Sequence, residues 1–162
     1  MEHIYHLTQK MIEFFEGDPK RIQHFIKVHS FAKLIGEGEE LDDKTLFILE
    51  AAALVHDIGI RPAEEKFGQC NGKLQEQEGP APARKMLESL GFEPEEVERI
   101  CYLVAHHHTY TNVEGMDYQI LLEADFLVNL YEENSPREAV QAALKNIFRT
   151  NTGIRICQVM FA

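Results

Sequence analysis

Two adjacent side chains that could bind a metal ion, His56 and Asp57, lie near the end of a helix-like run at residues 45–58. The run is apolar on almost every side, which is typical of a helix in the middle of a protein. Gly59 follows it and predicts that the helix ends there. Asp57 would then lie at the negative end of the helix dipole, where an unpaired anion is least stable. A buried carboxylate in this position must be protonated, paired or bound to a metal ion.

A second carboxylate, Asp125, shares a helix face with Leu121, Leu122 and Val128, which predicts that it is buried. By itself it could cap a helix, pair with an arginine or bind a metal ion. Two buried aspartates together with several histidines on helices form a set of nitrogen and oxygen donors. Such a set suits Zn, Mn, Fe or Mg better than a soft metal that prefers thiolates.

Six of the eight histidines lie in or next to apolar helices, namely His24, His29, His56, His106, His107 and His108. The last three end a helix, where histidines often only complement the dipole, and three in a row cannot all point the same way. Arg21 lies near the middle of the apolar arc of a helix at 19–36, in its first turn. An arginine there suits an anion, although it could equally pair with a carboxylate.

Composition and charge describe one globular domain. The chain has 162 residues, of which 44% are hydrophobic and 27% charged, enough for one substantial core. No apolar run approaches the roughly 20 residues that cross a bilayer, and the N-terminus lacks the order of a signal peptide. Three cysteines without a CxxC pair fit reduced thiols, so we expect a cytoplasmic protein that does not bind a membrane. The net charge of −11 argues against a nucleic-acid polymer as partner. It leaves a phosphorylated small molecule open, because a metal ion can supply positive charge locally.

Cap and turn residues divide the chain into helices almost throughout, and alternating strand patterns are scarce. We therefore predict an all-α fold, a single-domain helical bundle over residues 1–162. The expected helices lie at about 3–16, 19–36, 43–58, 80–90, 94 to the histidine run, 117–132 and 136–149. Loops are expected at 59–78 and 109–116, where they could form the walls of a substrate site. The tail at 150–162 could be strand, coil, or a segment that docks on its own domain or on a neighbouring chain.

The order of these residues resembles the HD superfamily of metal-dependent phosphohydrolases. His24, the pair His56-Asp57 and Asp125 follow the family's H…HD…D signature. Five local segments resemble the family's as well: R-x-x-H-x-x-x-V at 21–28, A-x-L-x-H-D-I-G at 52–59, and the segments at 79–92, 103–107 and 121–125. The resemblance covers about residues 18–132. Five ordered segments are a far more specific signal than one HD pair.

The resemblance implies a buried metal site whose ligands would be His24, His56, Asp57 and Asp125. In relatives with two metals, further histidines hold the second ion. His106 and His107 match two of them, but Gln75 stands where a third is expected. We therefore favour one tightly bound divalent ion (Fe, Mn, Zn, Ni, Co or Mg), with two ions as the alternative. His106 and His107 would then face the substrate or a loosely held second ion.

The function implied by the resemblance is hydrolysis of a small phosphomonoester or nucleotide by attack of metal-bound hydroxide. Asp57 or Asp125 would orient the attacking water, and His106 or His107, when protonated, would stabilise phosphoryl oxygens or protonate the leaving group. Phosphate-binding candidates are Arg21 and Arg61, the latter next to Ile60, where many relatives have a lysine. The alternatives are oxygen-dependent oxidation by a pair of irons and a non-catalytic domain that senses a nucleotide. A homodimer, formed through the apolar tail, is also left open.

Overall fold

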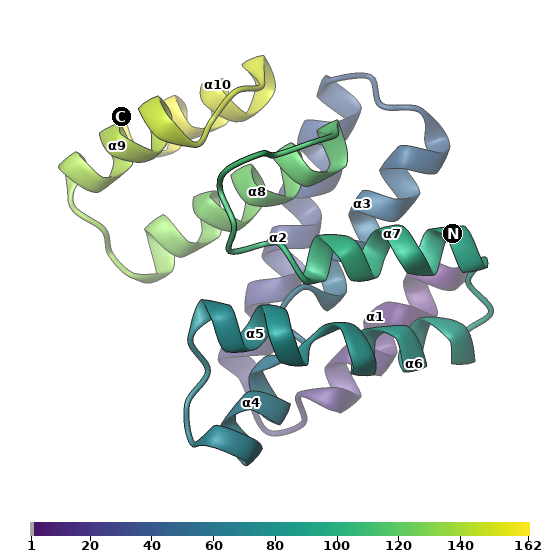
Figure 1. The fold of residues 1–162 in the computed structure, drawn as a ribbon. Coiled ribbons are helices and arrows are strands. Elements are labelled where there is room, and N and C mark those ends of the chain that lie inside the picture. Colours follow the sequence, from purple (N-terminus) through teal and green to yellow (C-terminus); the bar gives the residue numbers. More distant parts are fainter. Residues whose placement is uncertain (1) are drawn as a thin grey trace.

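The computed structural model describes residues 2–162 as ten α-helices, with no strand in that range (Figure 1). The helices are α1 Glu2–Phe14, α2 Pro19–Gly38, α3 Asp43–Val55, α4 Ile60–Phe67, α5 Gly72–Glu78, α6 Pro80–Ser89, α7 Pro94–Val104, α8 Met116–Glu132, α9 Arg137–Asn146 and α10 Asn151–Met160. The predicted all-α class is confirmed. None of these helices is long and apolar enough to cross a membrane.

The centre of the bundle is formed by α2, α3 and α8, each of which contacts the other two. Around them, α1 and α7 pack against α3, α6 packs against α7 and α1, and α4 and α5 lie together at the lower left of Figure 1. Three consecutive alanines, Ala51, Ala52 and Ala53, are fully buried in α3. Their small side chains let neighbouring helices approach closely, because interaxial distance follows the size of the side chains at the contact.

The end of α3 differs from the prediction. The helix stops at Val55, so that His56 and Asp57 form a turn between α3 and α4 instead of the last helical turn. Gly59 is not the stop signal, because its φ of −73° is helical and it begins α4. A glycine is needed here for space: a Cβ would lie 2.5 Å from the carbonyl oxygen of Gln75 and 2.8 Å from the nitrogen of Gly79. The turn that carries His56 and Asp57 is thus packed directly against the end of α5.

The predicted loop at 59–78 is mostly helical. It contains α4, which ends at Gly68 with a left-handed φ of 70°, and α5, which Asn71 caps by accepting a hydrogen bond from the Leu74 nitrogen. These helices have only 8 and 7 residues, too few for a hydrophobic period to be recognised.

The tail forms a helix and docks on its own domain. The helix predicted at 136–149 ends at Asn146, and α10 follows after Thr150, whose side chain accepts a hydrogen bond from the Gly153 nitrogen. The fully buried carboxylate of Glu123 in α8 accepts hydrogen bonds from the Thr150 hydroxyl at 2.6 Å and from the Arg149 nitrogen at 2.9 Å. Glu123 therefore anchors the start of α10. A homodimer stays a prediction.

We expect Glu123→Ala to lower the free energy of unfolding by about 3 kcal/mol, because it leaves the buried N–H and hydroxyl groups of Thr150 and the N–H group of Arg149 without an acceptor. Chemical denaturation measures the loss, and amide hydrogen exchange should show it concentrated in α10. Glu37→Ala, which removes an exposed acid from α2, is the matched control and should be nearly neutral. A loss below about 0.5 kcal/mol in Glu123→Ala would contradict the anchoring role.

Candidate metal centre

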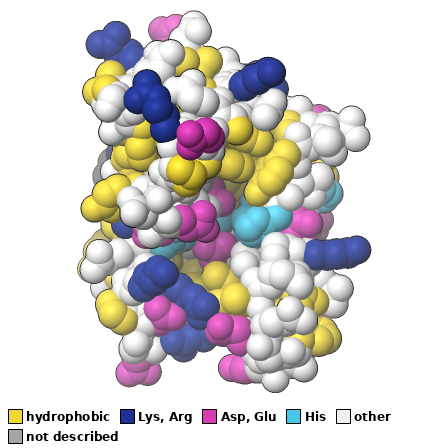
Figure 2. Space-filling model, turned by 90° about the vertical axis from the view of Figure 1, so that its left-hand side faces the viewer, with side chains coloured by type: hydrophobic (Ala, Val, Ile, Leu, Met, Phe, Trp, Pro, Cys, Tyr) yellow, Lys and Arg dark blue, Asp and Glu magenta, His cyan; other side chains and the backbone are white. Residues whose placement is uncertain are grey.

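A cavity of about 440 Å³ opens into the bundle between the first turn of α2, the α3–α4 turn and the end of α8. Figure 2 shows histidine side chains in a hollow at mid-height on one face of the molecule, with acidic side chains around them. The cavity is lined by Asp18, Lys20, Arg21, His24, Asp57, Ile60, Gln75, His108, Asp125, Asn129, Glu132 and Glu133. Two positive and five negative side chains thus surround two histidines, which is an environment that attracts cations.

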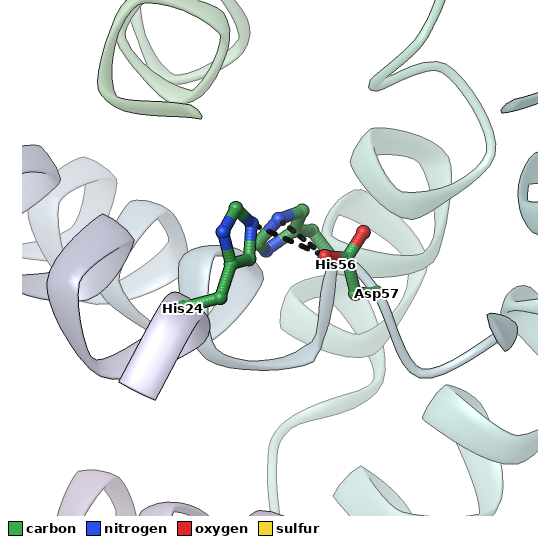
Figure 3. A group of neighbouring side chains, drawn as sticks. All are labelled: His24, His56 and Asp57. Atoms are coloured by element: carbon green, nitrogen blue, oxygen red, sulfur yellow. Dashed lines mark ion pairs between the residues drawn. The ribbon is translucent and has the colours of Figure 1, made fainter. Parts of the chain in front are cut away.

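Three of the four predicted metal ligands, His24, Asp57 and Asp125, line this cavity, and the fully buried His56 lies beside them. His24 projects from α2 towards His56 and Asp57, which lie on the turn after α3 (Figure 3). The Nε2 atom of His24 lies 3.2 Å from Asp57 Oδ2 and 3.1 Å from Asp125 Oδ1. The Nε2 atom of His56 lies 3.3 Å from the same two oxygens. Two imidazole nitrogens and two carboxylate oxygens therefore converge on one point, and His56, Asp125 and His24 are only 0%, 4% and 8% exposed.

The hydrogen bonding of His56 indicates what this point would hold. Its Nδ1 lies 2.7 Å from the carbonyl oxygen of Ala53 and must donate to it, since a carbonyl only accepts. The other nitrogen, Nε2, is buried and has no hydrogen-bond partner within residues 2–162. It faces the oxygens of Asp57 and Asp125, so it must carry either a proton or a cation. A divalent ion fits, because these residue types are its usual ligands and their donor atoms already converge.

Without a cation, the carboxylates keep protons on both histidines. Burial lowers the pKa of His24, but hydrogen bonds to Asp125 and Asp57 outweigh it and raise this pKa to about 10. Burial also opposes the charge on His56, yet the charges of Asp57 and Asp125 raise its pKa well above the usual value. Conversely, burial favours the neutral form of Asp57, but the charge on His56 holds its pKa well below the usual range. In the metal-free state, the two histidines are therefore positively charged and offset the negative charges of Asp57 and Asp125.

These shifts predict that metal binding releases protons. Near pH 7 both His24 and His56 are imidazolium ions in the metal-free protein, whereas an imidazole that binds a metal has lost the proton on the binding nitrogen and is neutral. We expect the release of about two protons per ion, so apparent affinity should rise by up to about 100-fold for each pH unit near pH 7. Calorimetric titration in buffers of different ionisation enthalpy counts the protons. An affinity that does not change with pH would contradict this protonation state.

A second group of donors lies on the other side of Asp57. Its members, Asp57, His107 and His108, are close enough together to hold a metal ion. His107 Nε2 lies 3.4 Å from Asp57 Oδ1, the carboxylate oxygen that His24 and His56 do not contact. Gln75 Oε1 completes the group, 2.8 Å from His108 Nε2 and 3.4 Å from His107 Nε2. Burial, and then the neighbouring His107, lower the pKa of His108 to about 4, so that this imidazole is neutral at pH 7.

The structure corrects the prediction for His106. Its Nδ1 donates to the Tyr102 carbonyl oxygen, and its ring stacks on the Tyr102 ring with centroids 4.1 Å apart, so it belongs to neither donor group. Of the three consecutive histidines, His107 and His108 are the two that lie close to Asp57. The shift of one residue arises because α7 ends at Val104, and helical spacing no longer sets the side-chain directions after it. His29 is also elsewhere, 2.9 Å from Glu50.

The two arginine candidates differ. Arg21 lines the cavity and also makes a two-pronged contact with Glu64, at 2.9 and 3.1 Å, so both of its predicted roles are compatible with the structure. The structure does not support Arg61 as a phosphate ligand. Its guanidinium donates to the carbonyl oxygens of Phe14 and Glu16 at the end of α1 and does not line the cavity. The reason is that residue 61 lies in a helix, α4, which directs it towards α1.

Two residues of the site were missed from the sequence. His108 carried no signal that separated it from its two neighbours. Glu132 lies at the end of α8 with its Oε1 2.7 Å from His24 Nδ1, and it follows Asp125 by seven residues. Seven residues are close to two helical turns, so the spacing could have indicated a shared face.

The family model of the HD domain matches residues 21–144 of this chain. A crystal structure described as a "predicted HD superfamily hydrolase" from an uncultured Thermotogales bacterium has 25% sequence identity and a TM-score of 0.70, covering 97% of this chain and 84% of that one. YpgQ of Bacillus subtilis has the same fold at 15% identity, with a TM-score of 0.68 over 98% of this chain and 88% of its own. Curated protein sequences give no match. Because the matched segment spans most of the sequence and contains His24, His56, Asp57 and Asp125, the chain belongs to the HD-domain family.

Proposed function

We propose that this protein is a metal-dependent phosphohydrolase that cleaves a small phosphomonoester or nucleotide. The observation that carries the proposal is the buried Nε2 of His56, which has no hydrogen-bond partner within residues 2–162 and faces the oxygens of Asp57 and Asp125. The ligands would be His24, His56, Asp57 and Asp125. The likeness to a protein described as a predicted hydrolase supports the reaction class.

When bound, a divalent ion supplies a water whose pKa is lowered from about 15.7 towards about 7, and it offsets charge on a phosphoryl oxygen. The side chains of the cavity would orient the attacking water and bind the phosphate group. Asp57 and Asp125 would orient the attacking water through the oxygens that converge at the floor. His107, in its imidazolium form, would donate a hydrogen bond through Nε2 to a phosphoryl oxygen, because its Nδ1 already donates to the Val104 carbonyl oxygen. Lys20 and Arg21, at the edge of the cavity, would attract the phosphate.

One tightly bound ion is the state that we favour. The first group has three close donors, His24, His56 and Asp57, and a fourth in Asp125, whereas the fourth donor of the second group is the neutral amide oxygen of Gln75. The Gln75 amide nitrogen donates to the Cys70 carbonyl oxygen at 2.6 Å, which fixes the amide oxygen towards the histidines. An amide oxygen binds a transition metal more weakly than an imidazole does. A second ion would therefore be held loosely between Asp57, His107 and His108.

The rival reaction, oxygen-dependent oxidation, needs two tightly held irons and is therefore disfavoured by Gln75. Metal analysis of protein purified without oxygen, followed by an oxygen-uptake assay, separates the two reactions. A non-catalytic sensing domain would instead show a ligand-induced rise in melting temperature without turnover.

The direct test is to remove metal with a chelator, restore Mn²⁺, Co²⁺, Zn²⁺, Ni²⁺, Fe²⁺ or Mg²⁺ singly, and assay a panel of phosphomonoesters and nucleotides for phosphate release. We expect at least one ion to restore phosphate release and the chelated protein to be inactive. Equal activity with and without metal would refute the proposal.

A further inference from the structure

We propose that Glu132 is a positioning residue that orients His24 for the metal ion, and that Lys27 holds Glu132 in place. The inference rests on the proposed metal site. His24 Nδ1 lies 2.7 Å from Glu132 Oε1, and Glu132 Oε2 lies 2.8 Å from Lys27 Nζ. A carboxylate oxygen only accepts, so His24 Nδ1 carries the proton of this hydrogen bond. In the metal-bound state Nε2 then keeps its lone pair on the side of Asp57 and Asp125.

His24 needs such a partner because of its place in the fold. His56 and His107 follow the ends of α3 and α7, and their Nδ1 atoms each lie 2.7 Å from a backbone carbonyl three residues earlier. Carbonyls near a helix end lack a partner four residues later and are free to accept. His24 instead lies within α2, where the carbonyls are occupied by the helix's own hydrogen bonds. Its Nδ1 must be held from another helix, and Glu132 of α8 does this.

The arrangement forms a bracket between the two helices. His24 and Lys27 are three residues apart on α2, and Asp125 and Glu132 are seven apart on α8, so each pair shares a helix face. Glu132 has a side chain only 14% exposed, and Lys27 offsets its charge. A carboxylate on the far nitrogen of a liganding histidine fixes the ring and strengthens its lone pair as a donor. Loss of such a partner typically weakens metal binding by about 10–100-fold.

The chain offers a matched control. His29, also on α2, lies 2.9 Å from Glu50 of α3, and the Glu50 side chain is 14% exposed, as is that of Glu132. Both pairs join α2 to another central helix, but only the Glu132 pair includes a proposed ligand. Glu50→Ala should therefore reproduce the structural cost of losing a carboxylate–histidine pair without affecting the metal.

The experiment measures Zn²⁺ affinity by competition with a chromogenic chelator, and the visible absorption of bound Co²⁺, in the wild type, Glu132→Ala, Glu132→Gln and Glu50→Ala. We expect Glu132→Ala to lose about 10–100-fold in affinity and to change the Co²⁺ spectrum. Glu132→Gln, which keeps the shape but not the charge, should lose about tenfold and remains informative if the alanine variant does not fold. Glu50→Ala should match the wild type in both readouts.

The proposal is overturned if Glu132→Ala or Glu132→Gln binds Zn²⁺ as tightly as the wild type, or if Glu50→Ala weakens binding equally. A wild type that binds no metal overturns the metal site and this inference together. A wild type that binds metal but releases phosphate from no substrate overturns only the proposed reaction, because the affinity comparison does not depend on turnover.

Discussion

Asp57→Ala is expected to abolish tight metal binding and phosphate release together. Asp57 is the side chain that both donor groups share: Oδ2 faces His24 and His56 at 3.2 and 3.3 Å, and Oδ1 faces His107 at 3.4 Å. Loss of a residue that only supports a ligand typically weakens metal binding by about 10–100-fold, so loss of a ligand should weaken it by more than about 100-fold.

Metal content after dialysis and phosphate release with the restored ion are the two measurements, with circular dichroism to verify that the helices remain. Asp43→Ala is the control, because it removes an exposed aspartate from the first turn of α3, the same helix that leads to Asp57. It should keep the metal content and turnover of the wild type. If Asp57→Ala kept wild-type metal content and turnover, Asp57 would have no part in a metal centre.

Gln75→His is expected to raise the metal content from about one to about two ions per chain, because an imidazole would replace an amide oxygen beside His107 and His108. Asp57 Oδ1 already faces this group, so the second ion would lie next to the first. Calorimetric titration gives the stoichiometry. Gln77→His adds a histidine to the exposed side of the same helix and should leave the content at about one. A content unchanged in Gln75→His would show that another feature limits the second site.

The convergence of the four side chains of the first donor group could be predicted, because long helices carry or lead into them. His24 and Asp125 lie within α2 and α8, of 20 and 17 residues, whose apolar faces show which side chains turn inwards. The pair His56-Asp57 follows a helix with seven buried residues in its last eight. A buried carboxylate must be protonated, paired or bound to a metal ion, and the resemblance to the HD family selected the metal ion and these four residues.

The second group could not be predicted in the same way, because helix ends determine it. After α7 ends at Val104, no periodic pattern distinguishes the directions of His106, His107 and His108. The direction of Arg61 could not be predicted for a related reason, because α4 is too short to show a hydrophobic period. The directions of these side chains depend on tertiary packing, such as the close contact of Gly59 with Gln75 and Gly79.

The structure also refines the electrostatic problem posed by Asp57. Because α3 ends before it, Asp57 belongs to a turn, and its two oxygens face different sets of histidines. The negative end of α3 still lies close by and adds to the need for a cation. His24, held by Glu132, and Asp125 bring the remaining donors from the two neighbouring helices.

Anomalous X-ray diffraction from crystals of the Mn²⁺-loaded protein would locate a metal ion between α2, the α3–α4 turn and α8. We expect a strong anomalous peak about 2.0–2.3 Å from Nε2 of His24, Nε2 of His56 and one carboxylate oxygen each of Asp57 and Asp125. An anomalous map with no peak among these four side chains, from protein saturated with Mn²⁺, would contradict this metal site.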